Sequence, residues 1–578
     1  MYSFKALHSA IDPNRSLEFC CYQQNSEMIY RSYADFKQDY LKLAHFLSSI
    51  GMSEQSVIGI MGRTRYEWNV ADCAVQVLSG ITVGFYANDS VQNIKRGLDI
   101  TQPKLMIIED YQQLKRLQDI DSDWGWEKPV IIMDSRHTDS APIYHLTHII
   151  KTPLKQKHLN ILESKIEAID EDLVCSYIFT SGTSGSQKAV ALSQKNLFHT
   201  ALTYHDYYPI NSNDSTLLYL PMSHVFARVM FYASIIWGQK HVYLDSPDQL
   251  ASAMPKHNPT TLLVVPRILD KIISTINGRV ESASFTKRLL FNSSIAVGKR
   301  RNGNQVTWLD RALYPLADKL VLHKLRGIFG NSLRFIGAGG GHLNPQSAMF
   351  FQSIGLPVYE GYALTESGGL GVFNHPQQYA IGTIGKPTKN VSIKVSEQGE
   401  LLINSPSNAL GYFNGKDIES IPQWLETGDQ AEVNEQGQIT IVDRLKDILV
   451  TSYGKNIAPS WIEDQFLLSP YIEDIVVIGD NRPYLTALIV QGSVDNDDDI
   501  KALLDIEIEK INASLARHEQ IKAYALVPEF NVDNNLLTAT FKKRRKAIES
   551  AFYADIERLY SKTPDTVLQK QPIQLVNN

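Results

Sequence analysis

Short apolar runs separated by segments of helix length constrain the fold of this chain more than any other feature. Four such runs lie in its first quarter, at residues 57–61, 81–85, 105–108 and 130–133. Strands that alternate with helices predict a parallel sheet covered by helices on both faces. No fixed-period repeat accompanies the alternation, so we do not expect a solenoid.

A loop rich in hydroxyl groups follows a fifth apolar run, at residues 173–178. Residues 179–188 read Phe-Thr-Ser-Gly-Thr-Ser-Gly-Ser-Gln-Lys, with five hydroxyl side chains, two glycines and one lysine. Glycines let successive N–H groups point at one place, while hydroxyls and an ammonium add donors and positive charge, as polyphosphate binding requires. In a Walker sequence a glycine precedes the lysine and a serine or threonine follows it. Here Gln187 precedes Lys188 and Ala189 follows it, so the loop is not a Walker sequence. We interpret it as phosphate-binding, with a solvated turn as the alternative.

Bulk properties limit the possible classes of protein. A chain of 578 residues predicts two or more domains, and its net charge of −6 argues against non-specific nucleic-acid binding. The four cysteines lack metal-ligand spacing and predict a reducing compartment. We expect a cytoplasmic protein, since no apolar segment has the length of a signal-peptide core or a bilayer-spanning helix. A peripheral membrane contact stays open.

Polar or glycine-rich segments follow three further apolar runs. Residues 217–220 lead to His224, which is either a core histidine at a helix start or part of a site. Residues 333–341 end in four glycines and an alanine, where a flat ligand can approach the backbone or where the chain simply turns. Residues 358–367 end in an aromatic, a hydroxyl and a carboxylate group. Ligands collect at the carboxyl ends of strands in α/β sheets, although an ordinary polar loop fits this segment equally well.

The pattern changes beyond residue 383. Runs at 391–395 and 400–403 alternate with turn residues and predict antiparallel strands, and 431–442 reads as a hairpin. We place a domain boundary after residue 443, with a small α+β domain beyond it.

Three charged segments have no motif of their own. Residues 282–329 are rich in Lys, Arg and Leu at helical spacings and predict surface helices. The acidic run 495–499 lacks the glycine and glutamate of a calcium loop and reads as a solvated loop. The basic run 542–546 reads mostly as a solvated helix face.

Together these segments resemble the adenylate-forming, or AMP-binding, superfamily. The matching motifs lie in the expected order, at residues 180–188, 361–366, 424–429, 443–447 and around Lys542. Within the superfamily the chain is most similar to long-chain fatty acid–CoA ligases, through residues 220–228, 265–272 and 325–335. It departs from the usual motifs at Gln187, Ala189, Ala363, Gln194 and Ala539.

The resemblance implies an α/β fold in two domains. Residues 1–443 would form a large domain of layered α/β sheets with a β-rich subdomain, and residues 444–578 a small, mobile α+β domain. It also implies a two-step reaction. A fatty acid carboxylate attacks the α-phosphorus of ATP to give acyl-AMP and pyrophosphate, and the thiol of coenzyme A then takes the acyl group. ATP, Mg²⁺ and coenzyme A would be needed, with no nucleic acid as partner. The sequence does not set the oligomeric state.

The resemblance also assigns site residues. The β- and γ-phosphates would be held by Thr180, Ser181, Gly182, Thr183, Ser184, Gly185 and Lys188. Thr183 and Glu366 would help to hold Mg²⁺. Tyr362 would stack on adenine, Thr365 would bond the α-phosphate, and Asp429 would bind the ribose with Arg444 nearby. Gly339, Gly340 and Gly341 would line the adenine and acyl side, and His224 the acyl site. Lys542 would reach the α-phosphate and the carboxylate, and Lys446 would be the hinge. Lys542, Thr365, Glu366 and Lys188 are the predicted catalytic residues.

Two other functions stay open. One is a fatty acyl-AMP ligase that loads an acyl carrier protein. The other is a non-catalytic nucleotide-binding protein with a decayed site, suggested by Gln187, Ala189 and Ala363.

Overall fold

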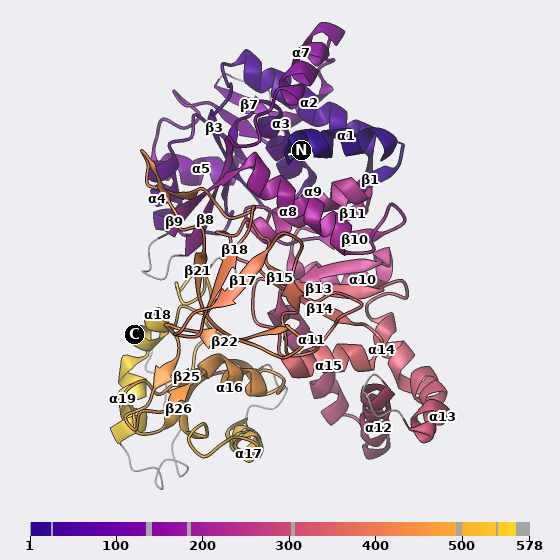
Figure 1. Ribbon diagram of the computed structural model, residues 1–578, viewed down its shortest axis with the longest axis vertical. Coiled ribbons are helices and arrows are strands. Elements are labelled where there is room, and N and C mark those ends of the chain that lie inside the picture. The colour runs from indigo at the N-terminus through magenta and orange to yellow at the C-terminus, as the bar shows by residue number, and fades with distance from the viewer. Residues whose placement is uncertain are drawn as a thin grey trace.

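The computed structural model describes most of the chain (Figure 1). The described residues are 2–14, 16–24, 27–134, 142–181, 187–301, 307–492, 500–538 and 542–561. Most of the predicted phosphate loop therefore lies outside them, including Gly182, Thr183, Ser184 and Gly185. The acidic run 495–499 and Ala539 also lie outside the described residues.

A nine-stranded sheet forms the core of the first half of the chain. In spatial order its strands are β20 (Ile418–Ser420), β19 (Gly411–Phe413), β9 (Gln187–Ser193), β8 (Val174–Ser181), β4 (Ile81–Phe85), β3 (Val57–Met61), β5 (Leu105–Ile108), β6 (Val130–Ile132) and β7 (Ile143–His145). Neighbouring strands from β8 to β7 are parallel, which confirms the predicted parallel sheet. The other pairs, from β8 through β9 and β19 to β20, are antiparallel.

Helices cover both faces of this sheet because successive strand residues point to opposite sides. Ile60 and Ile107 face the helices α2 (Tyr33–Ser49) and α3 (Tyr66–Val77). Met106 and Ile108 instead face the helices α4 (Val91–Thr101) and α5 (Tyr111–Ile120). Three further helices precede β8: α1 (Phe4–Asn14), α6 (Leu146–Lys151) and α7 (Gln156–Glu167).

In Figure 1 one further sheet lies to the right of the first, and another lies below it. One is ordered β10 (Ser215–Leu218), β11 (Lys240–Tyr243), β1 (Glu18–Gln24), β2 (Glu27–Ser32). The other is ordered β12 (Thr261–Val264), β13 (Phe335–Gly339), β14 (Val358–Tyr362), β15 (Val372–Phe373), β16 (Lys386–Pro387). The helices α8 (Gln194–Tyr207) and α9 (Val225–Trp237) lie against each other and contribute to the main core. They pack between the first sheet and these two sheets and so connect all three.

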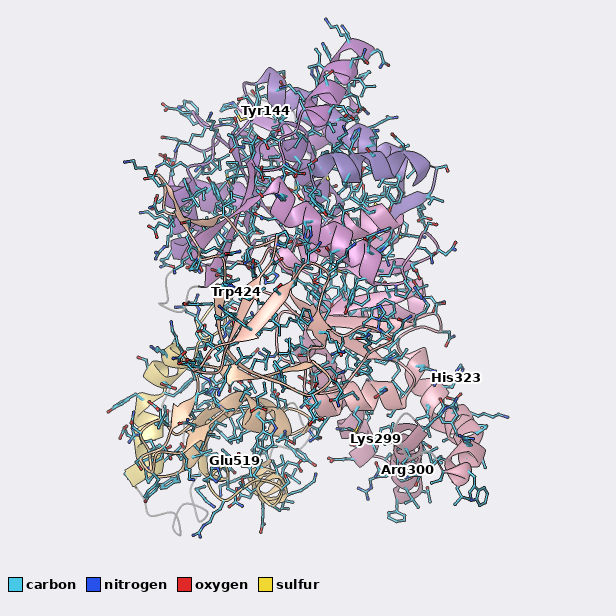
Figure 2. The ribbon with its side chains drawn as sticks, in the orientation of Figure 1. Tyr144, Lys299, Arg300, His323, Trp424 and Glu519 are labelled. Atoms are coloured by element: carbon cyan, nitrogen blue, oxygen red, sulfur yellow. The ribbon has the colours of Figure 1, made fainter. Side chains whose placement is uncertain are left out.

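Surface helices connect β11, β12, β13 and β14. They are α10 (Leu250–His257), α11 (Pro266–Glu281), α12 (Phe285–Arg301), α13 (Trp308–Ala317), a π-helical turn (Asp318–Leu322), α14 (His323–Gly327) and α15 (Pro345–Ser353). Figure 2 labels Lys299, Arg300 and His323 in this group, at the lower right. The predicted helices within 282–329 are confirmed.

Antiparallel and mixed sheets make up the rest of the chain. The first is ordered β17 (Ser392–Val395), β18 (Glu400–Asn404), β21 (Leu425–Val433), β22 (Ile439–Arg444), all antiparallel. The C-terminal segment contains β23 (Leu449–Val450), β24 (Asn456–Ile457), β25 (Ile472–Ile478), β26 (Leu485–Gln491) and β27 (Ile521–Val527). Its helices are α16 (Pro459–Phe466), α17 (Ile500–Asn512), α18 (Arg545–Ala551) and α19 (Tyr553–Ser561). The predicted fold class, α/β with a β-rich part and a C-terminal α+β part, is confirmed.

Within the described ranges, none of the helices combines the length and the apolar character needed to cross a membrane.

A buried ion pair ties α9 to α3 behind β8. Arg228 Nε donates to Asp72 Oδ2 at 2.9 Å, and Tyr232 donates to the same oxygen at 2.5 Å. Arg228 Nη1 also donates to Ser176 Oγ at 2.5 Å, and Ser176 is on β8, five residues before the end of that strand. The side chains of Arg228 and Asp72 are 2% and 0% exposed. This charge pair therefore lies in the core, directly behind the strand that leads to the predicted phosphate loop.

Candidate active site

Tyr362, Asp429 and Arg444 form a connected group where β14 ends beside the antiparallel sheet. The Tyr362 hydroxyl donates a hydrogen bond of 2.5 Å to Asp429 Oδ2. Asp429 lies directly opposite Arg444 on neighbouring strands, and Arg444 Nε lies 3.5 Å from Asp429 Oδ1. Burial raises the pKa of the Asp429 carboxyl, while the bond from Tyr362 and the charge of Arg444 act in the opposite direction. The group places a fixed carboxylate beside an aromatic ring.

Glycines at the ends of β13 and β14 let aromatic rings pack directly against these strands. Gly339, the last residue of β13, is paired in register with Gly361 on β14. Gly340 follows with φ of +79°, which side chains other than glycine rarely adopt. A Cβ on Gly339 would lie 3.1 Å from the ring of Phe226, so that ring fills the space beside this glycine.

A chain of contacts joins Lys188 to Glu366. Lys188 Nζ lies 4.4 Å from the centre of the Tyr412 ring, within the range of a cation–π interaction. The Tyr412 hydroxyl donates to Glu366 Oε1 at 3.1 Å. Sequence reasoning missed Tyr412. It belongs to β19, and only the antiparallel pairing of β19 with β9 brings it beside Lys188. No motif signals that pairing, because more than two hundred residues separate the two strands.

Gln187, the residue that departs from the usual loop motif, has a partner of its own. Its Nε2 donates to Asp89 Oδ2 at 3.2 Å. Asp89 also accepts from Asn93 Nδ2 at 2.6 Å, at the start of α4. Gln187 therefore ties the edge of the predicted phosphate loop to the start of α4.

Lys542 comes from the C-terminal segment, where two hydrogen bonds with Thr538 hold its backbone. Its backbone N–H donates to Thr538 Oγ1 at 3.0 Å, and Thr538 N–H donates to the Lys542 carbonyl at 2.9 Å. The basic run that follows is anchored inward. Lys543 Nζ lies 2.5 Å from Glu463 Oε2 on α16, and Arg545 contacts the other oxygen of Glu463. The expectation that this run is mostly a solvated helix face is therefore wrong for these two residues. They turn inward because Glu463, which is 3% exposed, needs cationic partners.

Contacts with α11 and with the segment before α15 hold the C-terminal segment in this position. Arg267 on α11 lies 2.9 Å from Asp474 Oδ2 on β25. Asn344 Nδ2 donates to the carbonyl of Asp464 at 2.7 Å, and His342 Nε2 lies 3.1 Å from Asp464 Oδ2. These contacts are polar, as in interfaces that open and close.

Restricted hydration and nearby charges both shift the pKa of Lys542. Restricted hydration lowers the pKa of Lys542 to about 8, and the positive charge of Arg444 acts in the same direction. The carboxylates of Asp429 and Glu366 partly offset this effect. Burial also lowers the pKa of His224 to about 4, with a smaller contribution from the charge of Lys542. The lysine therefore stands within electrostatic reach of both carboxylates and of a neutral histidine.

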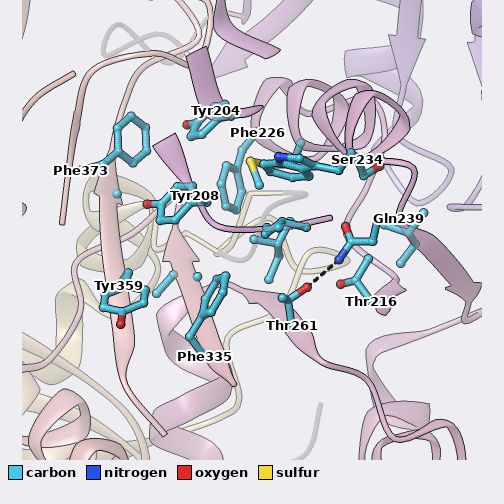
Figure 3. A pocket seen from close by; sticks show the side chains of 18 residues that line it. Tyr204, Tyr208, Thr216, Phe226, Ser234, Gln239, Thr261, Phe335, Tyr359 and Phe373 are labelled. Carbon is cyan, nitrogen blue, oxygen red and sulfur yellow. Dashed lines mark hydrogen bonds between the residues drawn. The ribbon is translucent and has the colours of Figure 1, made fainter. Parts of the chain in front are cut away.

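An apolar cavity lies between α8, α9 and the strands β10, β12, β13 and β14 (Figure 3). Its volume is about 40 Å³. Phe335, Tyr359 and Phe373 lie toward one end, and Ser234, Gln239 and Thr261 toward the other. Gln239 Nε2 donates to Thr261 Oγ1 at 2.8 Å, whereas the buried hydroxyl of Thr216 beside them has no hydrogen-bond partner among the described residues. The lining is apolar, as in sites that bind apolar ligands.

The cavity and the predicted site residues meet at the strand ends. Gly337 and Gly361 line the cavity, whereas Gly339 and Tyr362, a few atoms further along the same strands, belong to the site. Of the predicted acyl-site residues, neither His224 nor Gly339 lines the cavity. Phe226, two residues after His224, does so and lies between the cavity and Gly339. His224 caps α9, accepting from the Phe226 N–H at 3.2 Å.

The other predicted residues are placed as follows. Thr365 is buried one residue before Glu366. Gly341 follows Gly340 in the turn after β13. Lys446 is exposed, two residues after Arg444 and before β23. Thr180 pairs with Lys188 across β8 and β9, and the backbone of Ser181 pairs with Gln187 at the edge of the described loop. In the part of the chain that the structure describes, no three His, Cys, Asp or Glu side chains could together hold a metal ion.

The fold and the grouping of Lys542, Arg444 and Asp429 define the class of protein. The chain belongs to the AMP-binding enzyme family, whose model matches residues 17–413, and a model described as the AMP-binding enzyme C-terminal domain matches residues 446–564.

Individual relatives agree with that family. A long-chain-fatty-acid–CoA ligase of Mycobacterium bovis is 27% identical over 546 residues, which cover 89% of this chain and 90% of the relative. A fatty acyl-CoA synthetase of Dictyostelium discoideum is 26% identical, covering 89% and 83%. The adenylation domain of a carboxylate reductase from Mycobacterium chelonae has the same fold, with a TM-score of 0.76, 19% identity and coverage of 96% and 90%. The resemblance predicted from the motifs is confirmed.

Proposed function

We propose that this protein is a long-chain fatty acid–CoA ligase that forms acyl-AMP from ATP and a fatty acid and then transfers the acyl group to coenzyme A. The observation that carries this proposal is the position of Lys542. It reaches from the C-terminal segment to within electrostatic reach of Asp429, Arg444 and Glu366, where the apolar cavity meets the strand ends. Nucleotide, carboxylate and acyl chain can thus be bound side by side.

In the first step the chain's own residues position and stabilise charge. The ring of Tyr362 offers a face to adenine, and the carboxylate of Asp429 accepts hydrogen bonds from ribose hydroxyls. Lys188 and the backbone of Thr180 and Ser181 stand at the edge of the predicted phosphate loop. The attacking carboxylate is already a nucleophile, so no base is needed. Negative charge grows around the α-phosphorus, where Thr365 and Lys542 supply a hydroxyl and an ammonium.

The residues present fit a bound Mg²⁺. The ion prefers oxygen ligands and commonly takes only one or two carboxylates, with phosphates and water completing its shell. Glu366 supplies one such carboxylate, held in place by Tyr412. When bound, the ion neutralises phosphate charge. Thr183, the second predicted ligand, lies outside the described residues, and its role stays a prediction.

The second step requires that Lys542 withdraw and a thiol enter. The polar contacts between the C-terminal segment and α11 are of the kind that can open. Lys446, exposed between Arg444 and β23, is the proposed hinge. The division into domains 1–443 and 444–578 also stays a prediction.

Product analysis with purified enzyme, ATP, Mg²⁺ and palmitate tests the proposal. We expect palmitate-dependent release of pyrophosphate, and palmitoyl-CoA when coenzyme A is added. Accumulation of acyl-AMP without a CoA thioester would instead favour a ligase that loads a carrier protein. ATP binding without palmitate-dependent pyrophosphate release would favour the non-catalytic nucleotide-binding protein.

The rate of the first step should depend on pH through Lys542. Its ammonium stabilises negative charge only while protonated, so kcat/KM for ATP should fall as the pH rises above about 8. The measurement is palmitate-dependent exchange of pyrophosphate into ATP between neutral and alkaline pH. In Lys542→Arg the guanidinium stays protonated over this range, so the decline should disappear even if the rate is lower. A decline of unchanged shape in this variant would contradict the assignment.

Filling the cavity should shorten the preferred fatty acid. Gly337→Val places a side chain in the cavity, where the nearest atom is a terminal methyl of Leu263. Excluding about three methylenes forfeits roughly 2.4 kcal/mol, so kcat/KM for palmitate relative to octanoate should fall roughly 50-fold. Ile336→Val is the matched control, because Ile336 lies on the same strand but does not line the cavity. An equal fall for both acids in Gly337→Val would place the acyl chain elsewhere.

A further inference from the structure

The helices α12 and α13 form a hairpin whose apolar side chains face solvent. Phe285 and Leu289, in the first half of α12, are 70% and 57% exposed. Trp308, Leu313 and Leu316 on α13 are 74%, 46% and 57% exposed. A cluster of large apolar side chains this exposed on two adjacent helices marks a surface that meets another apolar phase.

The exposed face is built into the helices rather than left by loose packing. Leu309, Leu313, Leu316 and Leu320 recur at three- and four-residue spacing, which places them on one face. A neighbouring face of α13 is anchored, since Asp310 and Ala317 are buried. The second half of α12 lies against α15 so closely that a Cβ on Gly298 would lie 2.1 Å from the carbonyl oxygen of Ser353. A rigid base thus holds the apolar face outward.

The same segment is strongly basic in an acidic chain. Residues 285–327 contain nine Lys or Arg and two Asp, a net charge of +7, whereas the whole chain has −6. Both acids are already paired, Asp310 with Arg300 at 2.7 Å and Asp318 with Arg326 at 2.8 Å. Lys287, Arg288 and Arg311 are exposed on the same two helices as the apolar residues. The surface therefore combines exposed apolar groups with positive charge.

We propose that the α12–α13 hairpin docks on the surface of a membrane that contains anionic lipids. Leucine, phenylalanine and tryptophan side chains would enter the boundary between headgroups and acyl chains, and the lysines and arginines would lie against lipid phosphates. A second copy of this chain fits less well, because it would bring two surfaces of charge +7 together.

The hairpin lies within the connection between two strands of the cavity wall. β12 and β13, which precede and follow it in the chain, both supply residues to the cavity. In Figure 1 the hairpin stands at the lower right, across the molecule from α19. Docking through it leaves the C-terminal segment free to move. The docked protein would then take up its fatty acid from the membrane. This uptake rests on the proposed function, whereas docking itself does not.

Flotation of the full-length protein with vesicles tests the docking. We expect binding to phosphatidylcholine vesicles that contain about one quarter phosphatidylglycerol, weaker binding to pure phosphatidylcholine, and release as salt rises. Trp308→Ser/Leu313→Ser/Leu316→Ser should weaken binding at least roughly ten-fold. Lys287→Gln/Arg288→Gln/Arg311→Gln should weaken it and flatten the salt dependence.

Matched substitutions elsewhere keep the test decisive. Trp126→Ser/Ile161→Ser removes apolar groups that are 79% and 55% exposed outside the hairpin, and vesicle binding should be unchanged. The midpoint of thermal unfolding shows that each variant is folded, without reference to enzymatic activity. Three results would overturn the proposal. They are no flotation of the unaltered protein with anionic vesicles, equal loss in the control variant, and hairpin variants that change the oligomeric state but not vesicle binding.

Discussion

Lys542→Ala should abolish acyl-AMP formation while leaving thioester formation from supplied acyl-AMP largely intact. The ammonium is the cation that the C-terminal segment brings to Asp429 and Glu366, and in the proposed reaction it stabilises charge that grows at the α-phosphorus. Removing one preorganised donor of this kind costs about 3–4 kcal/mol of transition-state stabilisation, or roughly 100- to 1000-fold in rate. Once acyl-AMP exists, that charge has left with pyrophosphate, so the second step has no need of the lysine.

Two separate measurements distinguish the steps. Palmitate-dependent exchange of pyrophosphate into ATP reports the first, and single-turnover formation of palmitoyl-CoA from palmitoyl-AMP reports the second. Lys546→Ala is the matched control, since Lys546 is exposed in the same basic run and should leave both rates unchanged. Equal loss of the two half-reactions in Lys542→Ala would contradict the role given to this residue.

The sequence predicted most of the fold, because the relevant signals are local. Apolar runs such as Val57–Met61 and Leu105–Ile108 are read from their own residues, and both are parallel strands of the main sheet. The antiparallel part beyond residue 383 followed in the same way from alternation and turn residues. The order of the strands in the sheets could not be predicted from such local signals. β19 is paired with β9 across more than two hundred residues, and neither strand carries a sign of its partner.

The candidate site was predicted only as far as motifs reach. Tyr362, Asp429 and Arg444 sit in recognisable segments, and the structure brings them into contact. Tyr412 belongs to no motif and was missed. The basic run 542–546 was predicted to be mostly a solvated helix face. The ion pairs of Lys543 and Arg545 could not be foreseen, because their partner Glu463 lies eighty residues earlier and only the packed C-terminal segment brings it near. His224 was assigned to the acyl site; it caps α9 and does not line the cavity, which Phe226 lines instead.

Breaking the buried ion pair of Arg228 and Asp72 should greatly lower the free energy of unfolding. Asp72 accepts hydrogen bonds from Arg228, from Tyr232 and from Thr82, the last at 2.8 Å. Arg228→Met keeps a long side chain but leaves the carboxylate without a counter-charge in the core. Breaking such a pair from one side typically costs about 3–5 kcal/mol of the free energy of unfolding. The loss should appear as a lower thermal midpoint and as earlier unfolding in denaturant by near-ultraviolet circular dichroism.

A double substitution distinguishes the uncompensated charge from lost packing. In Asp72→Asn/Arg228→Met no charge is left in the core, so the double variant should be more stable than the sum of the two single losses implies. Lys501→Met is the control for an exposed pair, because Lys501 and Asp505 lie 3.4 Å apart with side chains 47% and 31% exposed, and we expect it to cost less than about 1 kcal/mol. Strictly additive losses at Asp72 and Arg228 would mean that the pair contributes by shape alone. Because Arg228 also bonds Ser176 on β8, the single variant should further weaken ATP binding at temperatures where the protein is still folded.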